Sequence, residues 1–400
     1  MAWGPVPALI VWGFQEILHR WVGDLQLTFG FLCGVFLVQY LLLSKIWDRY
    51  FQNLPRWLLW VSILFAGLAG PSTYMLNNYN AGRIYDAAVL GGQFFLLSGF
   101  FTAVIALQKW PSRWAAASTG VFWALAIGTR PDLAPAVGVM VLAVSVWALK
   151  IDGWSLNTIR RLLYMYSPLL LGCALVGWYN WARFGSVLET GYFYQMAGVN
   201  LHKHWNERFS FSYVIPNFYN YVLNPVLITS KFPFFQIQNG NSEAISGFGA
   251  IPDFYHAQML TGIIWNAPFV VFALAALRRV VTGMLISRRD PPSVKSEGEH
   301  LLSWIELTLT LSCLITFAVV LCYFWAAMRF LENLLPSLIV LSVLGFWHGY
   351  ERLSEKGIWS RLYCCLGIAL VSASVAISTL GTISVLTLRF QIADLFPLFR

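Results

Sequence analysis

The chain has 400 residues, of which 58% are hydrophobic and 11% charged, and its formal net charge is +8. A soluble globular domain carries about 25% charged residues, so this composition excludes a protein that is solvated by water alone. The basic residues are scattered over many short segments, which argues against a nucleic-acid-binding protein. The six cysteines lie inside apolar runs, and their spacing predicts neither a disulfide framework nor a zinc site.

The apolar runs indicate helices that cross a membrane. In hydrocarbon every backbone N–H and C=O needs an internal partner, so spans are helices or closed barrels. The runs are about 17 to 25 residues long, enough to cross about 30 Å as a helix, and they lack the alternation of barrel strands. We therefore expect an all-α polytopic transmembrane helix bundle of about ten spans: 25–43, 57–76, 87–107, 114–128, 133–149, 162–178, 259–277, 301–324, 331–347 and 362–388.

Two segments depart from this pattern. Residues 3–18 form a half-length apolar segment, too short to span, which we expect in or re-entering the membrane interface. The two short runs 114–128 and 133–149 are joined by GTRPD (128–132). Because Pro131 disfavours helical geometry at the preceding residue, we expect a tight turn there instead of one continuous helix.

The orientation follows from the Lys and Arg residues of the loops, which concentrate on the cytoplasmic side. Alternate short loops hold many of the 26 basic residues, among them Lys45, Arg49, Arg56, Lys109, Arg113, Lys150, Arg160 and Arg161. These loops are expected in the cytoplasm. Both termini and the longest loop, 179–258, then face outward.

We expect three sequence regions. Residues 1–278 form a membrane domain that comprises the half-length segment, six spans, the external loop 179–258 and a seventh span. Residues 279–300 are polar, contain Pro-Pro and indicate a cytoplasmic linker. Residues 301–400 form C-terminal membrane helices.

The outward side carries ionisable residues next to span ends. Such residues at membrane depth usually face protein or a wet cavity; the alternative is that they are interface anchors or local ion pairs. If the spans bundle, the guanidinium groups converge on an anion, and arginine suits phosphate because its fork makes bidentate bonds. In this setting the anion is a lipid phosphate or pyrophosphate. The sets are Arg83 with Asp86, Arg130 with Asp132, Arg183 with Glu189, and Arg329 with Glu332.

The long loop 179–258 is rich in aromatic residues. Because disordered segments are poor in aromatics, we expect it to fold over the bundle, either as an interfacial cap without a ligand role or as a surface that stacks on sugar rings. His202 and His204 have no zinc-ligand spacing, so we expect no metal site.

Several segments, in the expected order over most of the chain, resemble the GT-C superfamily of membrane glycosyltransferases, which includes protein O-mannosyltransferases and bacterial aminoarabinose transferases. WYNWARFGSVLETGYFYQMAG (178–198) is the most telling. The others are GRIYDAAVLGGQFFLLSGFF (82–101), FWALAIGTRPDLAPAVGVM (122–140), TGIIWNAPFVVFALA (261–275) and MRFLENLLPSLIVLSVLGFW (328–347).

The resemblance implies an integral membrane protein that moves a hexosyl or pentosyl group, with its active face outward. Because nothing in the sequence indicates eukaryotic sorting, we expect it in a bacterial inner (plasma) membrane. The donor would be a polyprenyl-phosphate sugar, and the acceptor a glycan, lipid or protein; no nucleic acid and no cofactor is implied. Basic residues would hold the leaving phosphate and a carboxylate would take the proton of the acceptor hydroxyl. We assign Arg130, Arg183 and Arg329 to the phosphate, and Tyr85, Tyr179, Asn180 and Tyr192 to the sugar and acceptor pocket.

The start of the sequence departs from the family. WGPVPALIVWG (3–13) resembles a segment that follows the first external loop there, so the first span and the loop with the catalytic acid have no counterpart. Asp86, Asp132 and Glu189 are the substitutes for that acid, and Glu16 and Asp24 are weaker ones. The sequence leaves open a truncated or inactive transferase, a non-catalytic membrane scaffold or assembly protein, and a lipid or solute transporter.

Overall fold

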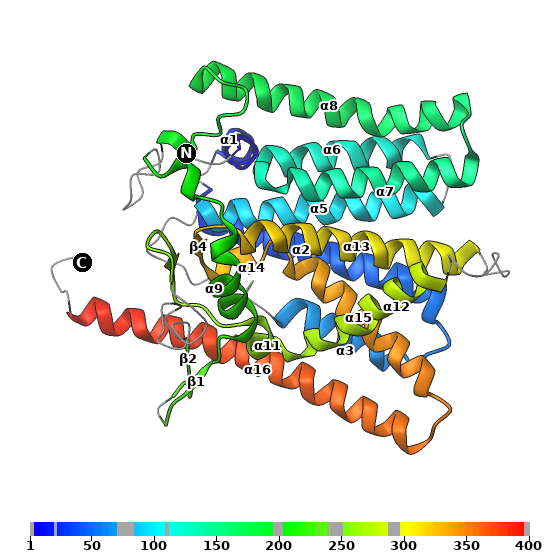
Figure 1. Cartoon of the computed structure of the whole chain (residues 1–400), viewed down its shortest axis with the longest axis vertical. Helices are drawn as coiled ribbons and strands as arrows, with labels where there is room; N and C mark the ends of the chain where they lie inside the picture. Colours follow the sequence, from blue (N-terminus) through cyan, green and yellow to red (C-terminus); the bar gives the residue numbers. More distant parts are fainter. Residues whose placement is uncertain are drawn as a thin grey trace. The chain divides into compact units, whose positions relative to one another are not determined.

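The structure of the chain is a computed structural model, and it describes residues 4–19, 22–69, 84–108, 112–194, 203–230, 232–237, 240, 251–286 and 297–395. Its α-helices are α1 (Val6–Leu18), α2 (Asp24–Ile46), α3 (Trp57–Leu68), α5 (Ile84–Gln108), α6 (Arg113–Thr129), α7 (Ala134–Asp152), α8 (Leu156–Phe184), α9 (Val214–Phe218), α11 (Ile263–Asn266), α12 (Ala273–Ile286), α13 (Glu297–Leu321), α14 (Met328–Leu331), α15 (Leu335–Leu353) and α16 (Ile358–Leu395). Figure 1 shows their arrangement.

Shorter elements connect these helices. The two-residue strands are β1 (Leu227–Ile228), β2 (Phe235–Gln236), β3 (His256–Ala257) and β4 (Trp325–Ala326). β1 pairs antiparallel with β2, and β3 pairs parallel with β4. The 3-10 and π turns are η1 (Trp47–Phe51), η2 (Pro131–Leu133), η3 (Tyr192–Tyr194), η4 (Trp205–Glu207), η5 (Phe211–Tyr213), η6 (Tyr219–Leu223) and η7 (Pro268–Phe272).

The all-α membrane class is confirmed. In the described residues 6 stretches are long and apolar enough to cross a membrane: Asp24–Phe51, Tyr85–Gln108, Pro131–Asp152, Leu156–Phe184, Glu299–Leu321 and Ile358–Ser384. The expected half-length segment is the 13-residue helix α1. The turn at GTRPD is also confirmed, because α6 ends at Thr129, Arg130 is extended and α7 starts at Ala134.

Two of the predicted spans differ from the helices of the structure. Residues 259–277 are no continuous span: α11 ends at Asn266, Ala267 leaves the helical region, and η7 begins at Pro268. Proline lacks an N–H and clashes with the preceding turn, so it starts a new helical segment there instead of continuing the old one. The span predicted at 162–178 is longer, since α8 runs from Leu156 to Phe184. The first residues of the predicted loop 179–258 are therefore helical.

The segment 279–300 is helical at both ends, since α12 continues to Ile286 and α13 begins at Glu297. Residues 287–296 lie outside the described residues, as do residues 70–83 after α3, with Arg83, and also His202.

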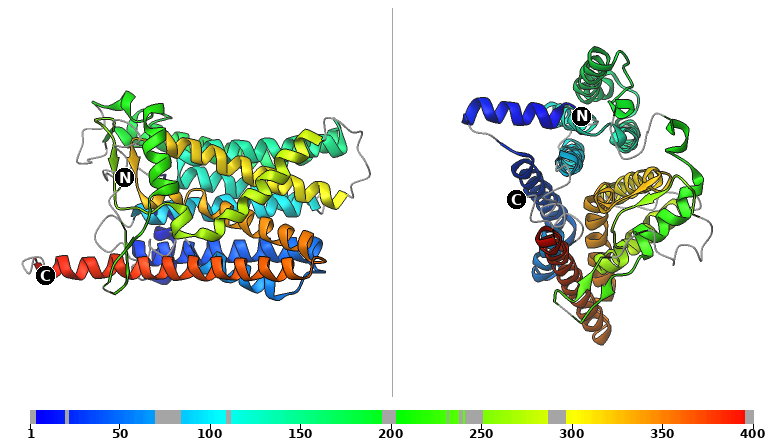
Figure 2. Two further views of the ribbon diagram at one scale, coloured as in Figure 1. Left: turned by 60° about the horizontal axis from the view of Figure 1, so that its bottom comes forward. Right: turned by 90° about the vertical axis from the view of Figure 1, so that its left-hand side faces the viewer.

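The chain divides into two compact units, each assembled from three separate stretches of sequence. The first comprises Met1–Leu42, Gly82–Asn206 and Ser296–Thr316, and the second comprises Leu43–Ala81, Glu207–Lys295 and Phe317–Arg400. In the first unit α5, α6, α7 and α8 lie side by side (Figure 1). In the second, α16 is one long helix (Figure 2).

Small residues hold the helices of the first unit close together. A Cβ at Gly120 of α6 would overlap the backbone carbonyl oxygen of Met165 on α8. Trp123 is fully buried and donates from Nε1 to the carbonyl oxygen of Leu96 on α5, at 3.3 Å. Without a hydrophobic driving force between helices in lipid, such close backbone approach and buried hydrogen bonds drive association.

In the second unit the core is aromatic. Trp347 of α15 is fully buried, packs edge-on against Trp47 with ring centroids 4.9 Å apart, and donates from Nε1 to Ser62 Oγ at 3.0 Å. The backbone N–H of Phe269, next to the break at Pro268, donates to Ser374 Oγ on α16 at 3.1 Å. The polar groups that the break exposes are thus taken up by neighbouring helices, as a membrane interior requires.

We expect Gly120→Ala to destabilise the chain, because its added methyl group meets backbone that cannot swing away; such overpacking costs about 1–3 kcal/mol. The apparent melting temperature in detergent should fall by several degrees. The matched control is Gly138→Ala on α7, where an added Cβ has no heavy atom within 4 Å. It should be neutral or stabilising, because alanine is the better helix former. Equal stability of the two variants would contradict the close α6–α8 contact.

Candidate functional site

The turn after α6 holds an ion pair. Arg130 Nε donates to Asp132 Oδ1 at 2.9 Å, and Nη2 donates to Oδ2. The side chain of Arg130 is only 2% exposed, whereas that of Asp132 is 39% exposed. Two parallel bonds between a guanidinium and a carboxylate fix both groups in one geometry. The accessible member of the pair is therefore the carboxylate.

The start of α5 lies at the same end of the first unit. A Cβ at Gly92 would stand 3.4 Å from Arg130 Cδ, so the aliphatic part of that arginine packs on α5. Asp86 is in the first turn of α5, next to Tyr85, and is 2% exposed. The positive end of the helix dipole favours a carboxylate at this position. A buried carboxylate and the Arg130–Asp132 pair thus belong to one end of the bundle.

The end of α8 reaches this place as well. A Cβ at Gly128, in the last turn of α6, would meet Val176 Cγ2 on α8 at 3.2 Å. Two turns further along α8, Arg183 Nη1 donates to the hydroxyl oxygen of Tyr179 at 2.8 Å. Its guanidinium carbon lies 5.0 Å from the centre of the Phe184 ring. Arg183 is exposed, so it presents an oriented positive charge at the surface of this end.

The segment that follows α8 folds back on itself. Gly185 has φ +72°, a left-handed conformation that suits glycine and ends the helix. Asn180 is buried and donates from Nδ2 to the carbonyl oxygen of Val187 at 3.1 Å. Glu189 Oε1 accepts from the backbone N–H of Phe193 at 3.2 Å. In this structure Asn180 and Glu189 thus stabilise the returning chain.

Aromatic rings gather in the same segment. Tyr192 packs edge-on against Trp205, with ring centroids 6.4 Å apart, and Phe193 stacks on Trp205 at 4.0 Å. The candidate residues of the first unit therefore form three separate groups. Arg130 pairs with Asp132 beside α5, and Arg183 donates to Tyr179. Glu189 accepts from the backbone N–H of Phe193, the neighbour of Tyr192 in the sequence.

Arg329 belongs to the second unit, in α14. Its guanidinium carbon is 5.3 Å from the centre of the Phe330 ring. Its positive charge lowers the pKa of the fully buried Tyr221, but burial raises that pKa more strongly. The hydroxyl oxygen of Tyr221 accepts from the backbone N–H of Ala327 at 3.1 Å. Arg329 thus lies beside a buried, neutral phenol and three residues before the fully buried Glu332.

A buried hydrogen-bonded network that the sequence did not lead us to expect lies in the same unit as Arg329. Asn217 donates from Nδ2 to the carbonyl oxygens of Leu321 and Tyr323, at 2.8 and 2.7 Å, where α13 ends. Tyr255 donates its hydroxyl to Asn217 Oδ1 at 2.9 Å and accepts from Asn220 Nδ2 at 2.7 Å. Burial raises the pKa of Tyr255, which keeps the donated proton in place.

A sequence signal for this network existed. In NFYNYVLN (217–224) the asparagines recur at spacings that place them on one helical face. Asn224, the last of them, is buried and donates from Nδ2 to the carbonyl oxygen of Leu260 at 2.8 Å. Because asparagine rarely lies in a core without partners, such a face predicts a buried hydrogen-bonded contact.

No family model and no curated protein matches the chain. Among solved structures, the oligosaccharyltransferase of Archaeoglobus fulgidus, tethered with an acceptor peptide that contains the NVT sequon, is similar over 96% of this chain, with a TM-score of 0.46 and 13% identity. The chain spans about half, 47%, of that protein.

We expect Asn217→Ala to destabilise the segment around Arg329, because it strips buried carbonyl groups of their donor, at about 1–3 kcal/mol. The melting temperature should fall, and limited proteolysis should cut residues 203–230 faster. Asn206→Ala, at an exposed position of the same segment, is the control and should behave as the wild type. Unchanged protease resistance of Asn217→Ala would show that the network does not hold this segment.

Proposed function

We propose that the chain is an inverting glycosyltransferase that moves a sugar from a polyprenyl-phosphate donor to an acceptor hydroxyl at the outer face of the membrane. The observation that carries the proposal is the bidentate pair of Arg130 and Asp132, packed on α5 at Gly92, with the exposed Arg183 at the end of the adjacent α8. Asp86 lies in the first turn of the same α5. Glycosyl transfer needs these two kinds of group: cations for a leaving phosphate and a carboxylate for a hydroxyl proton.

In this proposal the acceptor oxygen forms a bond to the anomeric carbon while the bond from that carbon to the phosphate oxygen breaks. The electron pair goes to the phosphate, and the acceptor proton goes to a carboxylate. Arg183 is the exposed guanidinium of the first unit and binds the phosphate. Arg329, in the second unit, is a separate candidate for phosphate binding. Arg130 adds its charge and orients Asp132.

Asp132 is the first choice for the base, because its carboxylate is accessible while its geometry is fixed by Arg130. Asp86 is buried and Glu189 accepts from the Phe193 N–H, so both are better suited to hold neighbouring groups in place than to act as the base. Tyr85, Tyr179, Asn180 and Tyr192 are proposed to shape the sugar and acceptor pocket.

The second candidate function is a non-catalytic membrane scaffold. The observation that favours it is that the charged groups already have partners within the fold: Arg130 has Asp132, Arg183 has Tyr179 and Glu189 has the Phe193 N–H. Ion pairs with a purely structural role would have the same geometry as these. Binding of the donor phosphate separates the two functions.

We expect Arg183→Gln and Arg329→Gln each to weaken binding of undecaprenyl phosphate, since a hydrogen bond to a charged group contributes about 1.5–3 kcal/mol, or about 10- to 100-fold in Kd. Binding is measured by fluorescence titration of the purified chain. Arg361→Gln, an exposed arginine in the first turn of α16, is the control and should leave Kd unchanged. If all three variants bind as the wild type does, the phosphate assignment is wrong.

Asp132→Asn should leave that binding largely intact but cut transfer of sugar from a polyprenyl-phosphate-linked hexose by about 10²–10⁴-fold, the contribution of a general base. The control is Asp253→Asn, an exposed carboxylate of the outward loop. Full transfer activity in Asp132→Asn would rule out Asp132 as the base, and absence of transfer and donor binding in the wild type would favour the scaffold.

A further inference from the structure

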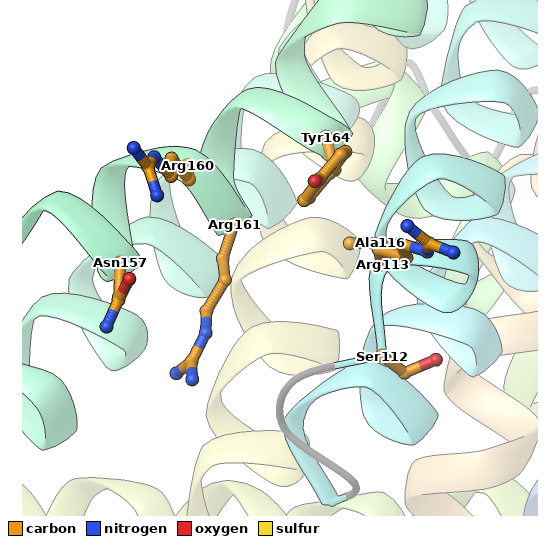
Figure 3. A pocket seen from close by; sticks show the side chains of 7 residues that line it. All are labelled: Ser112, Arg113, Ala116, Asn157, Arg160, Arg161 and Tyr164. Carbon is orange, nitrogen blue, oxygen red and sulfur yellow. The ribbon is translucent and has the colours of Figure 1, made fainter.

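A second polar site lies in the first unit at the other end of the helices that carry Arg130 and Arg183. It is a cavity of about 310 Å³ lined by Ser112, Arg113, Ala116, Asn157, Arg160, Arg161 and Tyr164. Its volume is at the lower end of the range of ligand pockets, about 300–1,000 Å³. As Figure 3 shows, α6 supplies one wall with Arg113, and α8 supplies the other with Arg160 and Arg161.

The charge of this cavity is one-sided. Arg161 Nη1 donates to Asp152 Oδ2 at 2.8 Å, which holds that guanidinium in place. Within the described residues neither Arg113 nor Arg160 forms an ion pair with a carboxylate. The described residues that line the cavity include three arginines and no carboxylate, so the cavity keeps a positive potential that an anion would neutralise.

Helix ends add to this potential. The walls are the first turns of α6 and α8, capped by Ser112 and Ser155, whose Oγ atoms accept from the N–H groups of Ala115 and Thr158 at 3.3 and 3.1 Å. The first turn of a helix is where acidic residues are favoured, yet neither first turn contains one. Instead, arginines lie at these helix ends, and their positive charge is repelled by the positive end of each helix dipole. A bound anion would offset this repulsion and stabilise both helices.

The surface around the cavity is apolar. Trp114 is 74% exposed and Trp154 is 84% exposed, with Leu163 also uncovered. Tryptophan concentrates at the membrane–water interface. A charged hollow with uncovered apolar side chains next to it matches a molecule that has an anionic head and hydrocarbon tails, whereas a free anion would use only the hollow.

We propose that this cavity binds the phosphate headgroup of an anionic phospholipid of the inner leaflet. The basic loops place this end of the helices on the cytoplasmic side. Basic pockets between membrane helices on that side suit anionic lipid headgroups. Arg113 and Arg160 contact the phosphate, Arg161 is oriented toward it by Asp152, and the acyl chains lie along α8 beside Leu163. This site is separate from the transfer chemistry proposed for the opposite end.

The test is native mass spectrometry of the purified full chain with added lipid. Phosphatidylglycerol should bind at least about tenfold more tightly than zwitterionic phosphatidylcholine. Each arginine near a membrane surface contributes about fivefold in affinity, so Arg113→Gln with Arg160→Gln should lower phosphatidylglycerol affinity by about 25-fold. Arg361→Gln, in an early turn of α16, is the control and should not change it.

A competition experiment with inorganic phosphate distinguishes a lipid headgroup from free phosphate as the ligand of the cavity. It should displace phosphatidylglycerol only at millimolar concentrations. If the double variant keeps wild-type affinity for phosphatidylglycerol, or if inorganic phosphate binds with the same arginine dependence while phosphatidylglycerol does not, the lipid site is refuted. Should the double variant lose its melting transition, Arg160→Gln alone decides, with an expected loss of about fivefold.

Discussion

The need of every backbone N–H and C=O for a partner, in a medium that offers no water, governs this structure. It forces the chain into helices and concentrates unsatisfied groups at their ends. Side chains meet this need at the start of α6 and α8, where Ser112 and Ser155 cap the first turns, and at the end of α13, where the amide of Asn217 takes two carbonyl oxygens. Polar chemistry therefore lies at helix ends.

The same constraint explains the two interruptions of the helices. Pro131 ends α6 and leaves Arg130 extended, so that its side chain turns to Asp132. Pro268 interrupts the segment 259–277, and the Phe269 N–H is taken up by Ser374 of α16. In the first case the break produces an ion pair at the surface of the bundle. In the second it is absorbed into the core, and no charged group results.

The two ends of the first unit differ in chemistry. One end holds the pair of Arg130 and Asp132, for which we proposed proton transfer beside a stabilised anion. The other end has three arginines around a cavity, one of them paired with Asp152. That end suits binding of an anion without chemistry. Two different functions, one at each end, can thus share the helices α6 and α8.

Much of the architecture could be predicted from the sequence because hydropathy and proline act locally. Apolar runs of spanning length, the turn at Pro131 and the half-length helix before residue 19 all depend on a few neighbouring residues. The broken segment at Pro268 was missed for the opposite reason: its hydropathy is that of a span, and Ser374, which takes up the Phe269 N–H beside the break, is more than a hundred residues away.

The candidate site residues show the same division between what neighbouring residues determine and what distant contacts determine. By itself the sequence determined which ionisable groups lie next to helix ends, because charge in an apolar chain is rare enough to stand out. Only the tertiary structure decided which distant groups meet: that Asn217 closes α13, and that arginines of α6 and α8 share a cavity. Those contacts depend on which helices pack together, and helix packing joins residues whose separation along the chain carries no local signal.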